Sequence, residues 1–151
     1  MKRIFTLIPV FVILIFASSC KDKDNNATPQ PTEMGKILVS YPWNMKTVTD
    51  VTGKVIPENQ WDIVARSLPH MNIEFQTGNK VFARGVGDPK VENGGSWYIS
   101  EDGKALDIDV IGIEGAFFIE ELSNTRMRLR KKMPVAGVEQ DGIMVFEPVV
   151  R

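Results

Sequence analysis

Cysteine and histidine, which serve as nucleophile, general base and zinc ligand in many enzymes, are almost absent from the chain. Cys20 is the only cysteine and His70 the only histidine among 151 residues. A single cysteine cannot form an intramolecular disulfide, and it has neither a resolving thiol nor companions for a metal site. No serine or cysteine nucleophile motif accompanies His70, and structural zinc needs several cysteine or histidine ligands. We therefore predict that His70 is structural or exposed and that the protein is not an enzyme and binds no metal and no cofactor.

Two aspartates stand close together in a segment where apolar and polar residues alternate. Asp107 and Asp109 are two positions apart, so both should project from the same face of one strand. Paired carboxylates can bind calcium, but calcium takes about six to eight oxygen ligands, most of them from loops. We interpret the pair as part of a solvated strand face.

The strongest cluster of positive charge follows the same alternation. Arg126, Arg128 and Arg130 occupy every second position, and Lys131 and Lys132 follow as part of the same cluster. Such a stripe could grip a carboxylate or a phosphate. It could equally pair across strands with acidic residues of the preceding segment, such as Glu120 or Glu121. We favour the cross-strand pairing.

Aromatic side chains are the other candidates for a site. The alternation should turn four of them inward, namely Trp43, Trp61, Phe75 and Phe146. They could fill the core of a small barrel or line a pocket for an apolar ligand. In the second case the predicted ligand-binding residues are Trp43, Phe75 and Leu129.

Two pairs of adjacent aromatic residues must place one ring on each face of a sheet. These pairs are Trp97 with Tyr98 and Phe117 with Phe118. An exposed ring of this kind would suit a partner protein or a glycan.

The glycines at 85, 87, 94 and 95 lack the spacing of a phosphate-binding loop and predict a mobile loop between strands.

The first twenty residues have the pattern of an export signal. Residues 1–3 are cationic at Lys2 and Arg3, and residues 4–16 are almost entirely apolar. Thirteen residues are too few to span a bilayer, which needs about twenty. The sequence Ala-Ser-Ser-Cys at 17–20 resembles the lipobox of bacterial lipoproteins. That resemblance implies cleavage after residue 19, lipid on Cys20 and attachment to the outer membrane.

Composition beyond the cleavage site indicates one modest domain on a tether. Residues 20–35 are predicted to be the lipidated cysteine and a flexible polar tether, and residues 36–151 the folded domain. The Lys-Asp-Lys-Asp run at 21–24 is either an export signal for the cell surface or a soluble spacer. Removal of residues 1–19 leaves a net charge of −3. This charge excludes the basic footprint of nucleic-acid binding.

Alternation with a period of two predicts an all-β fold from residue 37 onward. We expect eight strands, at 37–49, 71–77, 80–86, 95–100, 105–111, 116–121, 126–132 and 142–149. Turn signals at 77–79, 101–103, 123–124 and 141–142 join them as antiparallel neighbours. One short helical turn is expected at 57–67, with Trp61 and Val64 packed inward and Pro69 ending it. The fold is then an eight-stranded barrel or half-open barrel, with a two-sheet sandwich as the alternative.

Two segments in fixed order resemble the lipocalin-like domain lipoproteins of bacteria. They are Gly-Ser-Trp-Tyr-Ile-Ser-Glu-Asp-Gly-Lys-Ala-Leu at 95–106 and Ile-Glu-Glu-Leu-Ser-Asn-Thr-Arg-Met at 119–127. The resemblance implies an antiparallel β-barrel without catalytic role. We expect a lipid-anchored envelope domain that binds a small apolar or glycan ligand or a partner protein. The alternative is an assembly subunit with a filled barrel. Pro42 departs from the family's first strand and predicts a bent or edge start there.

The anchor can be tested by intact-mass measurement of the protein from the membrane fraction. We expect a chain that begins at Cys20 and carries the added mass of a diacylglyceryl group and an acyl chain. The variant Cys20→Ser should keep residues 1–19 and gain no lipid, because the thiol is the acceptor. A mature chain without lipid mass would contradict the assignment.

Overall fold

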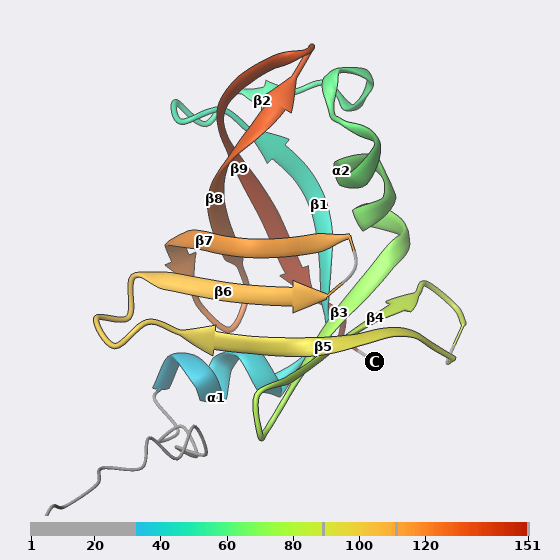
Figure 1. Cartoon of the computed structure of the whole chain (residues 1–151), viewed down its shortest axis with the longest axis vertical. Helices are drawn as coiled ribbons and strands as arrows, with labels where there is room; N and C mark the ends of the chain where they lie inside the picture. The colour runs from blue at the N-terminus through green and yellow to red at the C-terminus, as the bar shows by residue number, and fades with distance from the viewer. Residues whose placement is uncertain (1–32, 89, 111, 151) are drawn as a thin grey trace, which may run out of the picture.

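In a computed structural model, described for residues 33–88, 90–110 and 112–150, the chain forms a closed antiparallel β-barrel (Figure 1). The predicted export signal and Cys20 lie outside these residues. The strands are β1 (Trp43–Thr49), β2 (Val55–Ile56), β3 (Met71–Gln76), β4 (Lys80–Gly85), β5 (Val91–Ile99), β6 (Ala105–Val110), β7 (Ile113–Leu122), β8 (Met127–Val135) and β9 (Val138–Pro148). The helical elements are α1 (Glu33–Ser40), η1 (Glu58–Gln60), α2 (Ile63–Ser67) and η2 (Leu68–His70).

Pairing between the first and last long strands closes the barrel. Strands β3 to β9 pair with their neighbours in chain order, and β1 pairs with both β3 and β9. The short β2 adds to β1 as a ninth strand. The prediction of an eight-stranded antiparallel barrel is confirmed, and the closure rules out a two-sheet sandwich.

The start of the domain differs from the prediction. Residues 37–40, predicted as strand, belong to the helix α1, which begins at Glu33 inside the range predicted as tether. Leu38 is fully buried, and its carbonyl oxygen accepts a hydrogen bond from Trp43 Nε1 at 3.0 Å. Pro42 has no N–H for a ladder, so β1 starts only at Trp43. The helix covers one end of the barrel (Figure 1).

The helical stretch before β3 is longer than predicted. Trp61 is buried as expected, but Val64 is 49% exposed and Ala65 is buried in its place. The phase is set by Asp62, whose side chain accepts a hydrogen bond from the Ala65 N–H at 2.8 Å and so caps α2. Pro69 lies within η2 and does not end the stretch.

The last hairpin turns later than the sequence suggested. Residues 141–142, predicted as a turn, lie within β9, and the chain reverses at Ala136 and Gly137, both with positive φ. Gly142 faces inward, where an added β-carbon would lie 2.5 Å from Met133 Sδ. Met133 therefore fills the space that a side chain at position 142 would occupy.

The strand predicted at 95–100 begins earlier, so that Gly94, predicted as part of a loop, is a strand residue together with Gly95. Both lie in β5, opposite Phe82 and Val81 of β4. A β-carbon on Gly94 would meet the Phe82 ring at 3.1 Å, and one on Gly95 would collide with the carbonyl oxygen of Asp109. These residues lack side chains because β4 and β6 approach too closely for one.

The substitution Gly95→Ala tests this close approach. It should lower the free energy of unfolding by about 1 to 3 kcal/mol, because β5 and β6 must separate to admit the methyl group. Ser96→Ala, one residue along the same strand, is the control and should change it by less than about 0.5 kcal/mol. Urea denaturation measures both, and an unchanged midpoint for Gly95→Ala would refute the packing argument.

The carboxylate of Asp102 accepts the hydrogen bonds that hold the turn between β5 and β6. Asp102 Oδ1 accepts hydrogen bonds from Ser100 Oγ at 2.6 Å and from the Lys104 N–H at 3.0 Å. The Ser100 hydroxyl is the larger cause that lowers the pKa of Asp102 below its ordinary 3.8. Since the folded pKa is lowered, this stabilisation is present above pH 3.8 and is lost as the pH falls through the folded value.

We expect an NMR titration to give Asp102 a pKa below 3.8. Ser100→Ala should raise it toward that value, because the strongest donor to the carboxylate is gone. Ser123→Ala, in another hairpin, should leave it unchanged. An equal pKa in the wild type and Ser100→Ala would show that the hydroxyl does not carry the effect.

Candidate functional site

The three predicted ligand-binding residues lie inside the barrel. Trp43 and Leu129 are fully buried and Phe75 is 2% exposed. Phe75 meets Trp97 edge to face, with ring centroids 5.7 Å apart. Because neither Trp43 nor Leu129 has accessible surface, neither borders a space that water could enter. The interior around them is filled by side chains.

An open groove lies at the α1 end of the barrel. Its volume is about 620 Å³. It is lined by Val39–Pro42 as the chain leaves α1, by residues 74–77 of β3 and the turn after it, and by Val149 and Val150. Phe75 is the one predicted ligand-binding residue in this lining.

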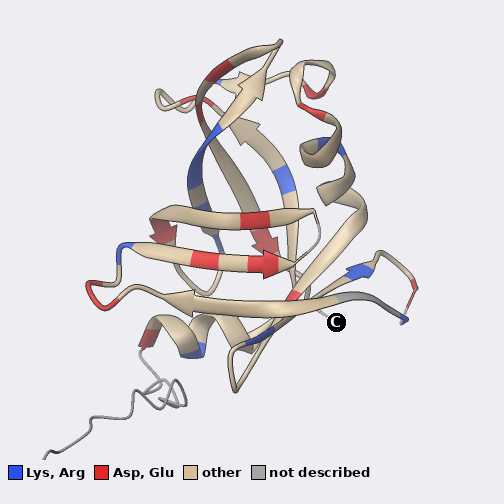
Figure 2. Ribbon diagram, in the orientation of Figure 1, with Lys and Arg blue, Asp and Glu red and all other residues tan. Residues whose placement is uncertain are grey.

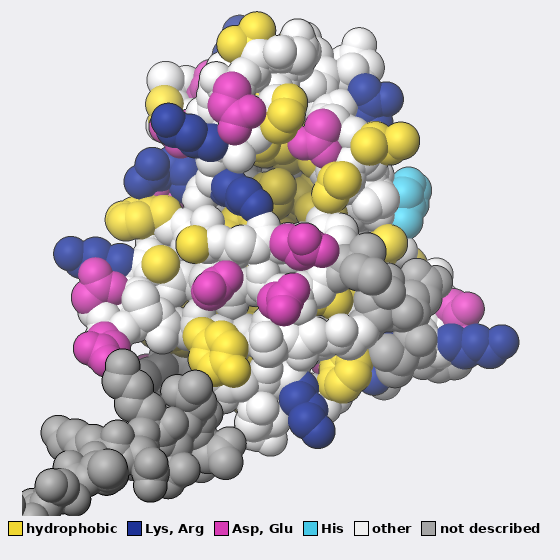
Figure 3. All heavy atoms as spheres, viewed as in Figure 1, with side chains coloured by type: hydrophobic (Ala, Val, Ile, Leu, Met, Phe, Trp, Pro, Cys, Tyr) yellow, Lys and Arg dark blue, Asp and Glu magenta, His cyan; other side chains and the backbone are white. Residues whose placement is uncertain are grey.

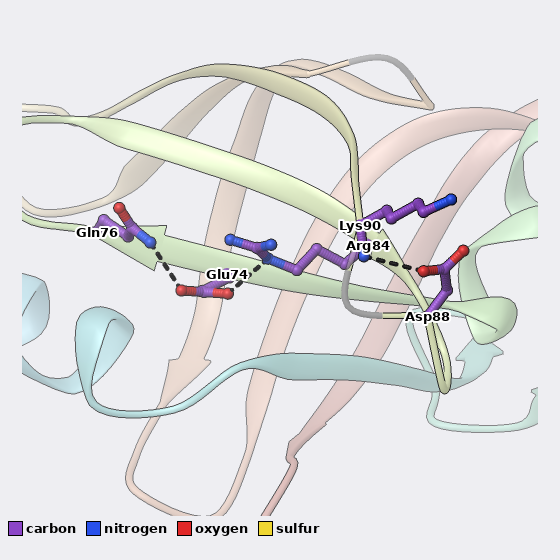
Figure 4. A network of polar contacts seen from close by, with 5 residues as sticks. All are labelled: Glu74, Gln76, Arg84, Asp88 and Lys90. Carbon is purple, nitrogen blue, oxygen red and sulfur yellow. Dashed lines mark hydrogen bonds and ion pairs between the residues drawn. The ribbon is translucent and has the colours of Figure 1, made fainter.

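Glu74 on the wall of this groove is held by its neighbours (Figure 4). It accepts hydrogen bonds from Gln76 Nε2 at 2.7 Å and from Arg84 Nε at 2.9 Å. The Arg84 guanidinium also lies 5.5 Å from the centre of the Phe82 ring. The carboxylate is thus engaged within the sheet.

The predicted charge clusters lie on the outer face. Asp107 and Asp109 are exposed while Leu106, Ile108 and Val110 are buried, as predicted. Figure 2 shows the acidic positions of β6 and β7 side by side. In the described ranges no group of three or more His, Cys, Asp or Glu side chains could hold a metal ion.

The arginine stripe pairs across strands at one position. Arg130 Nε lies 2.5 Å from Glu120 Oε1, and its guanidinium stacks 4.6 Å from the Phe118 ring centre. The prediction of pairing with Glu120 is confirmed for Arg130. For Arg126 and Arg128, no ion pair occurs within the part of the chain that the structure describes.

The adjacent aromatic pairs divide between the two faces as predicted. Trp97 and Phe117 are buried, whereas Tyr98 is 56% and Phe118 40% exposed.

His70 is exposed, and its carbonyl oxygen accepts a hydrogen bond from the Val86 N–H at 2.9 Å. It plays a backbone role at the start of β3.

Exposed apolar side chains gather at the barrel end opposite α1. Nine large apolar side chains are exposed among the described residues, and five of them belong to the β1–β2 connection, β2, α2 and the start of β9: Val51, Val55, Ile63, Val64 and Val138. Figure 1 shows β2, α2 and the β8–β9 tip together at this end. We call these five residues the distal patch.

A cleft opens beside this patch. Strand β7 pairs with β8 only from Phe118 onward, so its first half separates from β8. The space between β7, β8 and α2 has a volume of about 150 Å³ and an apolar lining that includes Ile113, Phe117, Met133 and Met144. Figure 3 shows a hollow with hydrophobic side chains at its floor in this region.

One lysine reaches into the cleft. Lys131 lies between Leu129 and Met133 in the inward-facing series of β8, and its ammonium lies 4.9 Å from the Phe117 ring centre. The ammonium also donates a hydrogen bond to the carbonyl oxygen of Glu114. Gly115 leaves room for it, since a β-carbon there would lie 3.2 Å from Lys131 Nζ.

Sequence reasoning missed this lysine, although a signal for it exists. Lys131 has the same parity along β8 as Met127, Leu129 and Met133, and that parity predicts an inward side chain. It was grouped with the surface charges because a lysine is rarely placed inward.

No helix in the described ranges is long and apolar enough to cross a bilayer. No protein-family model matches the chain, and no curated protein matches it in sequence.

Proposed function

We propose that this protein is a lipid-anchored, lipocalin-like envelope protein that acts without catalysis as a docking module for a partner protein. The distal patch is the docking surface. Cys20 supplies the attachment to the outer membrane.

The filled interior is the observation that carries this proposal. A barrel that encloses a small ligand needs a cavity, commonly of about 300 to 1,000 Å³. Here the three side chains predicted to line one belong to the hydrophobic core, and Trp43 and Leu129 have no accessible surface. Recognition then takes place on the outside of the barrel.

The position of the distal patch supports a partner that is met away from the membrane. The chain enters the barrel through α1, and the patch lies at the opposite end (Figure 1). Ile63 is 84% and Val138 65% exposed, which places apolar surface in water without a folding benefit. A partner protein that covers this surface would recover the free energy of its burial.

The groove at the α1 end supports a second candidate function. Its volume of about 620 Å³ lies within the range of small-molecule sites, and it contains Phe75. A small ligand bound there would be held close to the membrane. Native mass spectrometry of the mature protein would detect it as a co-purifying mass.

Site-specific photocrosslinking in intact cells tests the docking surface. A photoreactive phenylalanine at Ile63 or Val138 should give a discrete protein adduct. The same group at Val86 or Val150, which are 59% and 77% exposed, is the matched control and should give none. Val64→Asp should reduce the adduct at Ile63 by about tenfold, because an unpaired carboxylate is costly to bury.

The pattern of adducts decides the outcome. Adducts at the distal positions alone support docking at the patch. No adduct, or equal adducts at all four positions, would overturn the proposal.

A further inference from the structure

The cleft beside the distal patch has the size and chemistry of a pocket for one side chain. We infer that the partner inserts a single large apolar side chain here, with a carboxylate next to it that binds Lys131. This inference rests on the proposed docking function and specifies the chemistry of the segment that docks.

Size argues for a side chain and against a whole small molecule. At about 150 Å³ the cleft is roughly half the lower limit of common small-molecule sites. Two methionines, Met133 and Met144, form part of its wall, and their unbranched side chains adapt to the shape of an occupant. Leucine, methionine or phenylalanine would bring an apolar group suited to this wall.

The rim of the cleft argues for a protein as the source of that side chain. Val64 lines the cleft and is 49% exposed, and Ile63 next to it is 84% exposed. A small molecule in the cleft would leave these side chains in water. A protein segment would cover them as it inserts its anchor, which is the arrangement found at the centre of many interfaces.

Charge at the mouth argues for a neighbouring carboxylate. An ammonium has three donors, and the one Lys131 bond found among the described residues goes to the Glu114 carbonyl oxygen. Lys132 is also part of the lining and is exposed.

Asp62 and Glu114 also line the cleft, and neither carboxylate forms an ion pair with Lys131 among the described residues. Asp62 already accepts the Ala65 N–H as the cap of α2, and Glu114 is exposed on the outer face of β7. An incoming acidic residue therefore finds a positive charge fixed over the Phe117 ring.

A displayed library of random heptapeptides is the probe for this inference. The full lipidated chain, solubilised in mild detergent, is used for selection. We expect enriched peptides to carry one leucine, methionine or phenylalanine with an aspartate or glutamate within two positions. Peptides without an acidic residue, basic peptides, or no enrichment would overturn the inference.

The variant Lys131→Met keeps the aliphatic stem over Phe117 and removes the charge. It should weaken an enriched peptide by about tenfold, as expected for a lost charged hydrogen bond. Lys80→Met, on β4, is the matched control and should bind as the wild type does. Unchanged affinity in Lys131→Met would overturn the role of this lysine.

A second measurement needs no variant. Methyl NMR signals of Met133 and Met144 in the wild-type chain should shift when an enriched peptide is added, and unshifted signals would place the peptide elsewhere.

Failure of the inference is distinct from failure of the docking function. If the adducts at Ile63 and Val138 are undiminished in Lys131→Met, docking at the distal patch is supported and insertion of a side chain into the cleft is contradicted.

Discussion

Pairing of β1 with β9 joins the two ends of the sheet, and the other features of the domain depend on it. Trp43 begins β1 opposite Pro148 and is fully buried. Its indole N–H binds the Leu38 carbonyl oxygen and so fixes α1 across the barrel end. Closure removes the sheet edges that would otherwise pair with other chains, and it fixes which residues turn inward.

Closure at this size leaves little room inside. Eight strands enclose an interior that side chains can fill, and here Phe117, Leu129 and Phe146 are among those that do. Among the described residues, β7 separates from β8 along its first half and leaves a cleft there. The recognition proposed above therefore uses surface features rather than an internal cavity.

The alternation of side chains predicted most of the fold and little of the site. Strands such as β3 and β6 were predicted within a residue or two, because strict alternation and a following turn fix both face and end. Residues 37–40 were predicted wrongly because a short apolar run fits a strand as well as a helix, and only the contact of Leu38 with Trp43 decides.

The site was harder to predict because it depends on distances between strands. Nothing local to Gly95 reveals the carbonyl oxygen behind it, and nothing local to Lys131 reveals that β7 has moved away. Both features depend on how two neighbouring strands are placed relative to each other. The alternation along β8 nevertheless predicts that Lys131 points inward. The residue type favours the surface instead, because lysine is rarely buried.

Placement of the apolar side chains at one end also bears on colloidal behaviour. Removal of residues 1–19 leaves a net charge of −3, which gives copies in free solution only weak electrostatic repulsion, so that two distal patches can meet face to face. Copies anchored through their N-termini on one membrane would present their patches away from it, so a face-to-face meeting would require the domains to turn on their tethers. Attachment would thus suppress self-association while it leaves the same surface open to a partner from outside the layer.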